Sequence, residues 1–223
     1  MKKLLFFILI GGLITIYYSC SKEQSIGGPN VLGGETDIPL TVLGSVSDLY
    51  IYLGGSQVHG TMTITAKQGG ICTYHALIDF TGHPDSAFYA SVIPRKYFDS
   101  LGRFNYDIKM NITSEGIQEY SYDGSINNPW TIVKYNDGVG TVYPFRPGSP
   151  NIRTVTAKST EDDFPMGFYL IKVSKVVQPY PPDDQYIDTL VFYANHKFGL
   201  VTLEVKLKSG ILAKCDVRPW FLL

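Results

Sequence analysis

The stretch Arg103–Thr113, with the sequence RFNYDIKMNIT, alternates apolar and polar residues and decides the fold class. Every second position is apolar, and these residues are Phe104, Tyr106, Ile108, Met110 and Ile112. Successive side chains of a β-strand point to opposite faces of the sheet, so the pattern predicts a strand with one buried and one solvated face. Strands of this kind are typical of antiparallel sheets.

Similar runs recur along the rest of the chain. Thr61–Ala66 and Cys72–Phe80 also alternate, and Gly69-Gly70 between them fits a hairpin turn. Further strands are predicted at Leu49–Leu53, Gln118–Tyr122, Trp130–Tyr135, Gly140–Phe145, Ile152–Ala157, Phe168–Val177, Tyr186–Tyr193, Leu200–Leu207 and Ile211–Val217. Turn signals between them are Asp123-Gly124, Asp137-Gly138, Pro147-Gly148 and Ser209-Gly210.

The predicted elements indicate an all-β fold, either an antiparallel β-sandwich or a curved, partly closed β-barrel-like sheet. At most one short helix is expected, at Pro94–Leu101, where Pro94 fits the first turn and Gly102 the end. No sequence period repeats, which disfavours a propeller or a solenoid. We therefore expect residues 38–223 to form a single β-domain.

The N-terminus has the organisation of an export signal. Lys2 and Lys3 precede the uncharged, mostly apolar stretch Leu4–Ile16, and a small residue, Ser19, stands directly before Cys20. An uncleaved membrane helix fits less well, because a span needs roughly 20 apolar residues. Ordinary signal peptidase cleavage also fits less well, because no small-x-small site precedes the cysteine. We expect residues 1–19 to be removed as a signal peptide.

This segment resembles the signal of bacterial lipoproteins, in which the cysteine becomes the first residue of the mature chain. The resemblance implies that Cys20 carries a diacylglycerol thioether and an amide-linked acyl chain such as palmitate, and two or more chains anchor a protein stably. Residues 20–37 are rich in glycine and are expected to form a flexible tether. The implied partner is a membrane, and the implied location is the outer membrane of the bacterial envelope, with the periplasmic and surface faces both open.

The composition excludes some partners. Removal of residues 1–19 leaves 204 residues with 17 basic and 20 acidic side chains, a formal charge of −3. No basic patch indicates nucleic acid as a partner. Charged residues make up 17% of the whole chain, below the roughly 25% of average soluble domains. This profile is typical of an exported β-protein.

Cys72 and Cys215 remain as an even pair once Cys20 is acylated. In an oxidising compartment they are candidates for a disulfide, which would close a loop of 143 residues and contribute about 4–5 kcal/mol. The bond requires their Cα atoms to lie within about 7 Å of each other. The alternative is two separate buried thiols.

No motif assigns catalysis, a metal or a cofactor. The four histidines, His59, His75, His83 and His196, lack the short spacing of a metal motif, and the chain has no Gly-x-Ser-x-Gly nucleophile elbow. The acidic runs at residues 161–163 and 183–184 are predicted to be solvated loops, with a calcium site as the alternative. We assign no catalytic residue, metal ligand or cofactor and expect a protein without enzymatic activity.

Tyrosines are the candidate ligand-binding residues, because an apolar ring with a polar tip suits exposed faces that bind sugars or proteins. Tyr120 and Tyr122 share one side of a predicted strand, and Tyr143 and Tyr180 lie beside prolines. These four residues are predicted to contribute to a binding face. The alternative is that they pack across strands.

The C-terminal stretch Val191–Lys206 resembles a recurrent ending of bacterial lipoproteins of unknown function. Tyr193-Ala194 and Gly199-Leu200-Val201 carry this resemblance, which covers under a tenth of the chain. It implies a β-hairpin and no particular chemistry.

These observations predict an envelope lipoprotein that acts as a non-catalytic binding module for a glycan, a protein or another envelope component. A carrier of a hydrophobic ligand is the alternative. It would need the sheet to curl around an apolar cavity, and an unfilled interior above about 300 Å³ would favour it. A hydrolase would require several polar side chains that converge, such as His75 or His196 close to a carboxylate.

Overall fold

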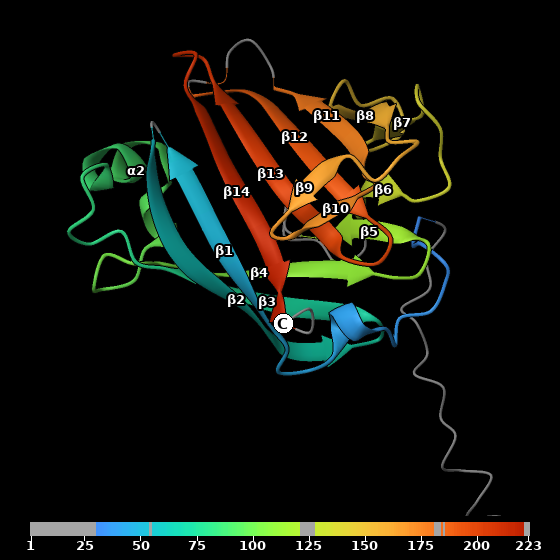
Figure 1. Ribbon diagram of the computed structural model, residues 1–223, viewed down its shortest axis with the longest axis horizontal. Helices are drawn as coiled ribbons and strands as arrows, with labels where there is room; N and C mark the ends of the chain where they lie inside the picture. Colours follow the sequence, from blue (N-terminus) through green and yellow to red (C-terminus); the bar gives the residue numbers. More distant parts are fainter. Residues whose placement is uncertain (1–29, 54, 121–127, 181–183, 185, 221–223) are drawn as a thin grey trace, which may run out of the picture.

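The computed structural model describes residues 30–53, 55–120, 128–180, 184 and 186–220. It is dominated by a single twelve-stranded antiparallel sheet in the order β6-β5-β4-β3-β2-β1-β14-β13-β12-β11-β8-β7, and β9 and β10 form a separate two-stranded hairpin. The sheet curls around its own interior, so that its two edge strands, β6 and β7, approach each other (Figure 1). The prediction of an all-β, barrel-like sheet with a single short helix is confirmed.

Most strands follow one another along the chain as hairpins. The first half of the sheet consists of β1 (Val46–Leu53), β2 (Ser56–Gln68), β3 (Ile71–Ile78), β4 (Phe104–Ile112), β5 (Gly116–Glu119) and β6 (Trp130–Lys134). The second half consists of β7 (Val142–Pro144), β8 (Ile152–Lys158), β11 (Ser174–Pro179), β12 (Ile187–Asn195), β13 (Gly199–Leu207) and β14 (Leu212–Pro219). The separate hairpin is β9 (Phe164–Met166) and β10 (Tyr169–Ile171), and the helical segments are η1 (Pro39–Thr41), α2 (Ser86–Val92) and η2 (Arg95–Tyr97).

Strand β4 has the two faces that its alternation predicted. It pairs with β3 in a register that places Ile108 opposite Tyr74 and Met110 opposite Cys72. Ile108 and Met110 point into the sheet interior, whereas the alternate residues Asp107 and Lys109 are exposed. The tight turn between β2 and β3 uses Gly69 and Gly70, both with positive φ, which is the backbone that a primed hairpin turn requires.

Hydrogen bonds made by side chains, rather than a backbone ladder, join the two edge strands, β6 and β7. The buried indole Nε1 of Trp130 in β6 donates to the backbone oxygen of Tyr143 in β7 at 3.1 Å. The Tyr143 hydroxyl accepts from the backbone N–H of Lys134 at 3.1 Å and donates to Asp137 at 3.0 Å. We call this contact the seam, and it makes the sheet nearly closed.

Two sequence predictions in the second half of the chain have different outcomes. The hairpin predicted within Val191–Lys206 is confirmed, because β12 and β13 pair antiparallel and Asn195 closes their turn by accepting from the backbone N–H of Lys197 at 2.7 Å. The single strand predicted at Phe168–Val177 is wrong, because the chain breaks there into β10 and β11. The β9–β10 hairpin folds over the outer face of the sheet, where Phe164 stacks on Tyr193 with ring centroids 4.9 Å apart.

The helix predicted at Pro94–Leu101 is also misplaced. The only α-helix among the described residues is α2, which ends before Pro94, and Arg95–Tyr97 forms a short 3₁₀ turn. The chain then turns into β4, because the Asp99 carboxylate accepts from the backbone N–H groups of Leu101 at 2.9 Å and Arg103 at 3.0 Å. This local side-chain bonding competes with helix formation.

The N-terminal segment lies along the outer face of β4 and β5. The Gln118 amide accepts from the backbone N–H of Leu32 and donates to the backbone oxygen of Asn30, both at 2.8 Å, and Glu35 N–H donates to the Ser114 hydroxyl at 2.9 Å. Residues 30–37, assigned to the tether from the sequence, therefore contact the domain. The signal peptide, Cys20 and the rest of the tether lie outside the described residues.

Candidate ligand cavity

The interior of the curled sheet contains a cavity of about 290 Å³. Side chains from both halves of the sheet line it, and apart from Ser47 and Glu119 these are mainly aliphatic and aromatic. The lining residues are Leu40, Ser47, Leu49, Met62, Tyr74, Ala76, Ile78, Phe104, Ile108, Met110, Ile112, Glu119, Ile132, Phe192, Phe198, Gly199, Leu200, Leu203, Cys215, Val217 and Pro219. The curvature of the sheet thus creates a partly open apolar site.

The volume of this cavity lies just under the roughly 300 Å³ at which ligand pockets usually begin, so size alone does not define a carrier. The lining is more informative than the volume, because it is almost entirely apolar and water does not fill an apolar cavity readily. Such a lining suits an apolar occupant.

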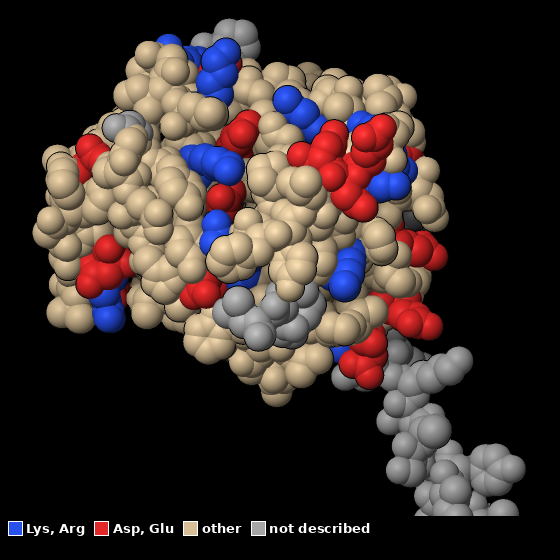
Figure 2. Space-filling model, in the orientation of Figure 1, with Lys and Arg blue, Asp and Glu red and all other residues tan. Residues whose placement is uncertain are grey.

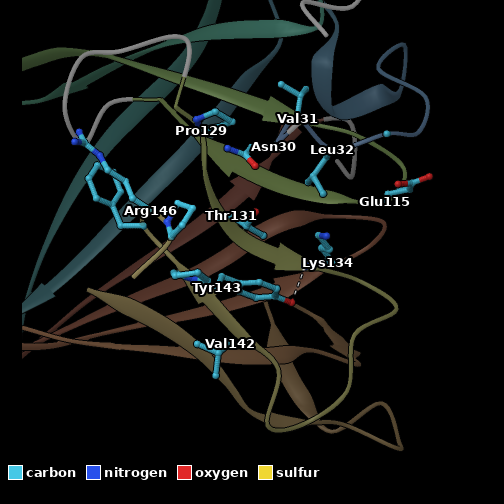
Figure 3. Close-up of a pocket in the computed structure, with 14 residues that line it drawn as sticks. Asn30, Val31, Leu32, Glu115, Pro129, Thr131, Lys134, Val142, Tyr143 and Arg146 are labelled. Atoms are coloured by element: carbon cyan, nitrogen blue, oxygen red, sulfur yellow. Dashed lines mark hydrogen bonds between the residues drawn. The ribbon is translucent and has the colours of Figure 1, made fainter. Parts of the chain in front are cut away.

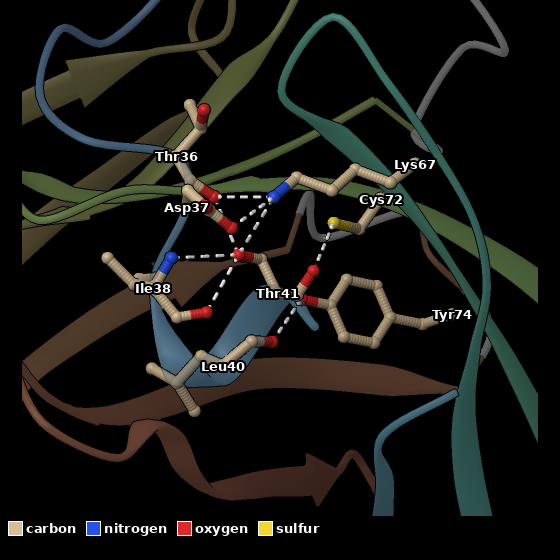
Figure 4. A network of polar contacts seen from close by, with 8 residues as sticks. All are labelled: Thr36, Asp37, Ile38, Leu40, Thr41, Lys67, Cys72 and Tyr74. Atoms are coloured by element: carbon tan, nitrogen blue, oxygen red, sulfur yellow. Dashed lines mark hydrogen bonds and ion pairs between the residues drawn. The ribbon is translucent and has the colours of Figure 1, made fainter. Parts of the chain in front are cut away.

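The 3₁₀ turn η1 contributes Leu40 to the cavity wall. Figure 4 shows the polar contacts that hold this turn against the sheet. The buried Thr41 hydroxyl donates to the Thr36 backbone oxygen at 2.6 Å, and Lys67 Nζ donates to the same oxygen at 3.0 Å. From the sheet, the Tyr74 hydroxyl donates to the Leu40 backbone oxygen at 3.2 Å, and burial raises the pKa of Tyr74 well above its usual value, which keeps this donor protonated. The segment that leads from the N-terminus is therefore fixed against the cavity.

The opposite end of the sheet is covered by the α2 region. Tyr89 of α2 stacks on Phe80 with ring centroids 4.2 Å apart, and both rings are buried in an apolar cluster with Ile78 and Val217. Ile78 and Val217 also line the cavity. The cavity thus lies between two covered ends of a nearly closed sheet.

Glu119, a lining residue of the cavity, forms an ion pair with Arg153. Arg153 in β8, with only 2% of its side chain exposed, donates from one terminal nitrogen to Glu119 Oε1 and from Nε to Gln178 at 2.9 Å. Its guanidinium carbon lies 3.9 Å from the centroid of the Trp130 ring and 4.8 Å from that of Phe192. Sequence reasoning missed this cluster, although a charged residue at an inward position of the strand Ile152–Ala157 was a usable signal.

Cys72 and Cys215 are not bridged to each other. They lie in β3 and β14, which are separated by β2 and β1, and three strand spacings of about 4.8 Å amount to roughly 14 Å. This separation exceeds the roughly 7 Å that a disulfide allows between Cα atoms, so the disulfide considered from the sequence is absent. The Cys215 thiol instead lines the cavity, and burial raises its pKa to about 12.

The predicted tyrosine face is not assembled among the described residues. Tyr120 and Tyr143 are only 3% and 5% exposed, so their rings are packing residues rather than exposed binding surfaces. Tyr143 is buried because it belongs to the seam. Tyr180 is partly buried at the end of β11, and Tyr122 lies outside the described residues.

A second pocket, of about 360 Å³, lies on the surface between the N-terminal segment and the seam (Figure 3). Its walls include Leu32, Glu115, Thr131 and Lys134, and the Tyr143 ring lies along one side with its hydroxyl bonded to Lys134. Charged and polar groups are more frequent here than in the interior cavity. The pocket is formed only because residues 30–33 lie against the domain.

The histidines do not form the convergent site that hydrolysis needs. His59 with Asp48, and His75 with Asp107, form pairs at 2.8 Å on the solvent-exposed face of the sheet. Ser56 donates to Asp85, which lies 3.9 Å from His83, so the carboxylate stands between the hydroxyl and the imidazole. A serine nucleophile requires the opposite order, with the imidazole in the middle.

The remaining surface carries charges of both signs. Figure 2 shows acidic and basic side chains interspersed over the viewed face, with wide uncharged areas between them. Across the described ranges, no group of three or more His, Cys, Asp or Glu residues is placed to hold a metal ion. No helix in the described part of the chain is long and apolar enough to cross a membrane.

Comparisons with known proteins give few matches. No model of a known protein family matches the chain, and no curated protein matches its sequence. Among solved structures, a Bacteroides fragilis protein proposed to be exported and having a YmcC-like fold is 9% identical, with a TM-score of 0.46 over 80% of this chain and 96% of that chain. A proposed lipoprotein of Parabacteroides distasonis is 12% identical, with a TM-score of 0.42 over 83% of this chain and 98% of that chain.

Proposed function

We propose that this protein is a lipid-anchored, non-catalytic binding protein of the bacterial envelope whose β-domain holds an apolar ligand in the interior cavity. The observation that carries the proposal is the apolar cavity of about 290 Å³ that both halves of the curled sheet line. A core that needs no ligand would fill this space with side chains, because protein interiors are normally close-packed. Between the two binding roles that the sequence leaves open, the geometry favours the carrier.

The proposed anchor rests on residues 1–20 of the sequence. Ten residue steps separate Cys20 from Asn30, the first described residue, and an extended chain of this length spans at most about 35 Å. The cavity would therefore remain close to the membrane surface, which suits exchange of an apolar ligand with lipid. Radioactive palmitate should label the wild-type protein and not Cys20→Ala, and label that persists in the variant would contradict the anchor.

Binding is tested with N-phenyl-1-naphthylamine, an uncharged apolar dye whose fluorescence rises in apolar surroundings. We expect saturable binding to the wild-type protein. Ala76→Phe places a ring inside the cavity and should abolish binding. His75→Phe is the matched control, because it adds a ring at the adjacent position of β3 on the outward face. Equal binding by both variants would contradict a ligand site in the cavity.

A further inference from the structure

Among the described residues that line the interior cavity, Glu119 alone is charged. Glu119 ends β5 opposite Met110 of β4, so it shares the inward face with Met110, which also lines the cavity. Its side chain is 19% exposed. A carboxylate in an apolar wall is costly, since burial of a charge without compensation is strongly unfavourable. The presence of the Glu119 carboxylate in this wall therefore needs a compensating interaction or a function.

Arg153 compensates the charge and fixes the carboxylate. The guanidinium donates to Glu119 Oε1, to Gln178 and, at 3.4 Å, to the backbone oxygen of Trp130, and aromatic rings of Trp130 and Phe192 flank it. Well-packed apolar residues often give equal or better stability than a buried ion pair. A gain in folding stability therefore does not explain the Glu119–Arg153 pair well. The pair does hold the Glu119 carboxylate in place, as a hydrogen-bond acceptor at the cavity wall.

The second carboxylate oxygen of Glu119, Oε2, can accept further hydrogen bonds. Arg153 bonds to Oε1, and Oε2 accepts no hydrogen bond from any residue in the described part of the chain. An ionised carboxylate can accept about four hydrogen bonds. A ligand in the cavity can therefore donate to Glu119 without disturbing the ion pair.

The charge balance restricts the head group of such a ligand. Glu119 and Arg153 together are neutral, so an ammonium or a carboxylate head would add a net charge to an apolar site, and a carboxylate would also face Glu119 with like charge. A neutral hydroxyl adds no charge and supplies the donor. We propose, as a refinement that rests on the proposed function, that the cavity selects a neutral single-chain amphiphile whose head group donates a hydrogen bond to Glu119.

Displacement of N-phenyl-1-naphthylamine by three compounds that each carry a straight ten-carbon chain tests this selection in the full-length protein. 1-Decanol has an apolar chain and a donor, 1-methoxydecane has the same chain and no donor, and decanoic acid is charged at pH 8. We expect decanol to bind the wild-type protein at least about 10-fold more tightly than either of the others, as is typical of a hydrogen bond to a charged group. Equal affinities of alcohol and ether would overturn the proposal.

Glu119→Gln replaces the acceptor with an amide whose N–H₂ group can face the cavity. The preference for the alcohol over the ether should fall to less than about 3-fold, and decanoic acid should gain affinity. Ser47→Ala, at a second small polar position of the lining, is the matched control and should keep the wild-type order of affinities. An unchanged preference in a folded Glu119→Gln protein would also overturn the assignment.

The displacement results distinguish a failure of head-group selection from a failure of apolar-ligand binding. If the dye binds the cavity and all three compounds displace it equally, the apolar site stands and the head-group selection fails. If the dye does not bind at all, the proposed function fails first. Should Glu119→Gln not fold, as judged by circular dichroism, the comparison of the three compounds in the wild-type protein still decides.

Discussion

Trp130→Ala is the most informative single perturbation of the fold, because Trp130 holds the two edge strands together. The side chain is fully buried, its Nε1 bonds to the Tyr143 backbone oxygen at 3.1 Å, and its ring packs edge-on against Phe145 with centroids 5.1 Å apart. Truncation of a buried tryptophan to alanine costs about 3–5 kcal/mol of stability. The lost hydrogen bond accounts for about 1 kcal/mol and places this variant in the upper part of that range. We expect a loss of about 4–5 kcal/mol in the free energy of unfolding.

Urea denaturation followed by far-UV circular dichroism measures this loss. With a typical urea slope of about 2 kcal/mol per molar, the midpoint should fall by about 2 M. Trp130→Phe keeps a ring without the N–H donor, and its midpoint should fall by roughly 0.5–1 M, for a loss of about 1–2 kcal/mol.

Trp220→Ala is the matched control, because the same chemical change occurs at a side chain that is 50% exposed. Its midpoint should change by less than about 0.3 M, since substitutions at exposed sites usually stay within about 0.5 kcal/mol. If Trp130→Ala shifted the midpoint no more than Trp220→Ala, the seam would not stabilise the fold and the closure of the sheet would need another explanation.

Three further predictions concern the thiols and the close-packed strands. Because the folded pKa of Cys215 is about 12 and its usual value is 9.0, unfolding releases its proton between these values, so stability should fall as pH rises through this range. Between pH 9 and 10.5 the wild-type protein should lose about 1–2 kcal/mol more than Cys215→Ala, and parallel pH profiles of unfolding would refute this. Thiol titration of the denatured, unreduced protein should detect both Cys72 and Cys215, whereas a disulfide would leave neither. A methyl group added at Gly116 would lie 2.2 Å from the Val133 backbone oxygen, so Gly116→Ala should lower the melting temperature. A methyl group added at Gly138 would have no neighbouring atom within 4 Å, so Gly138→Ala should leave the melting temperature unchanged.

The sequence predicts the strands better than their arrangement. The alternation of β4 is visible because one face is buried and the other is wet, and the Gly69-Gly70 turn is visible because few residues accept positive φ. The order of strands and the seam depend on contacts between residues far apart in the chain, and periodicity carries no information about these. Helix α2 escaped prediction because its sequence, SAFYASV, is rich in residues with weak helix propensity.

The candidate site was harder to predict than the fold. Strand β5 has buried residues on both faces, because the N-terminal segment covers its outer side at Gln118, so alternation does not distinguish Glu119 from its neighbours. The tyrosines were expected at the surface because rings with polar tips suit exposed faces, but Tyr143 satisfies its hydroxyl within the seam. A cavity depends on what the packed side chains leave unfilled, and composition does not determine this.

A crystal structure of the protein grown with 10-bromo-1-decanol would show whether the cavity holds an amphiphile, because the anomalous signal of bromine locates the alkyl chain without ambiguity. We expect a bromine peak inside the curled sheet, among Ala76, Ile108 and Leu203, with the hydroxyl oxygen within hydrogen-bond distance of Glu119. Bromine peaks confined to the surface, with the interior cavity empty, would contradict this expectation.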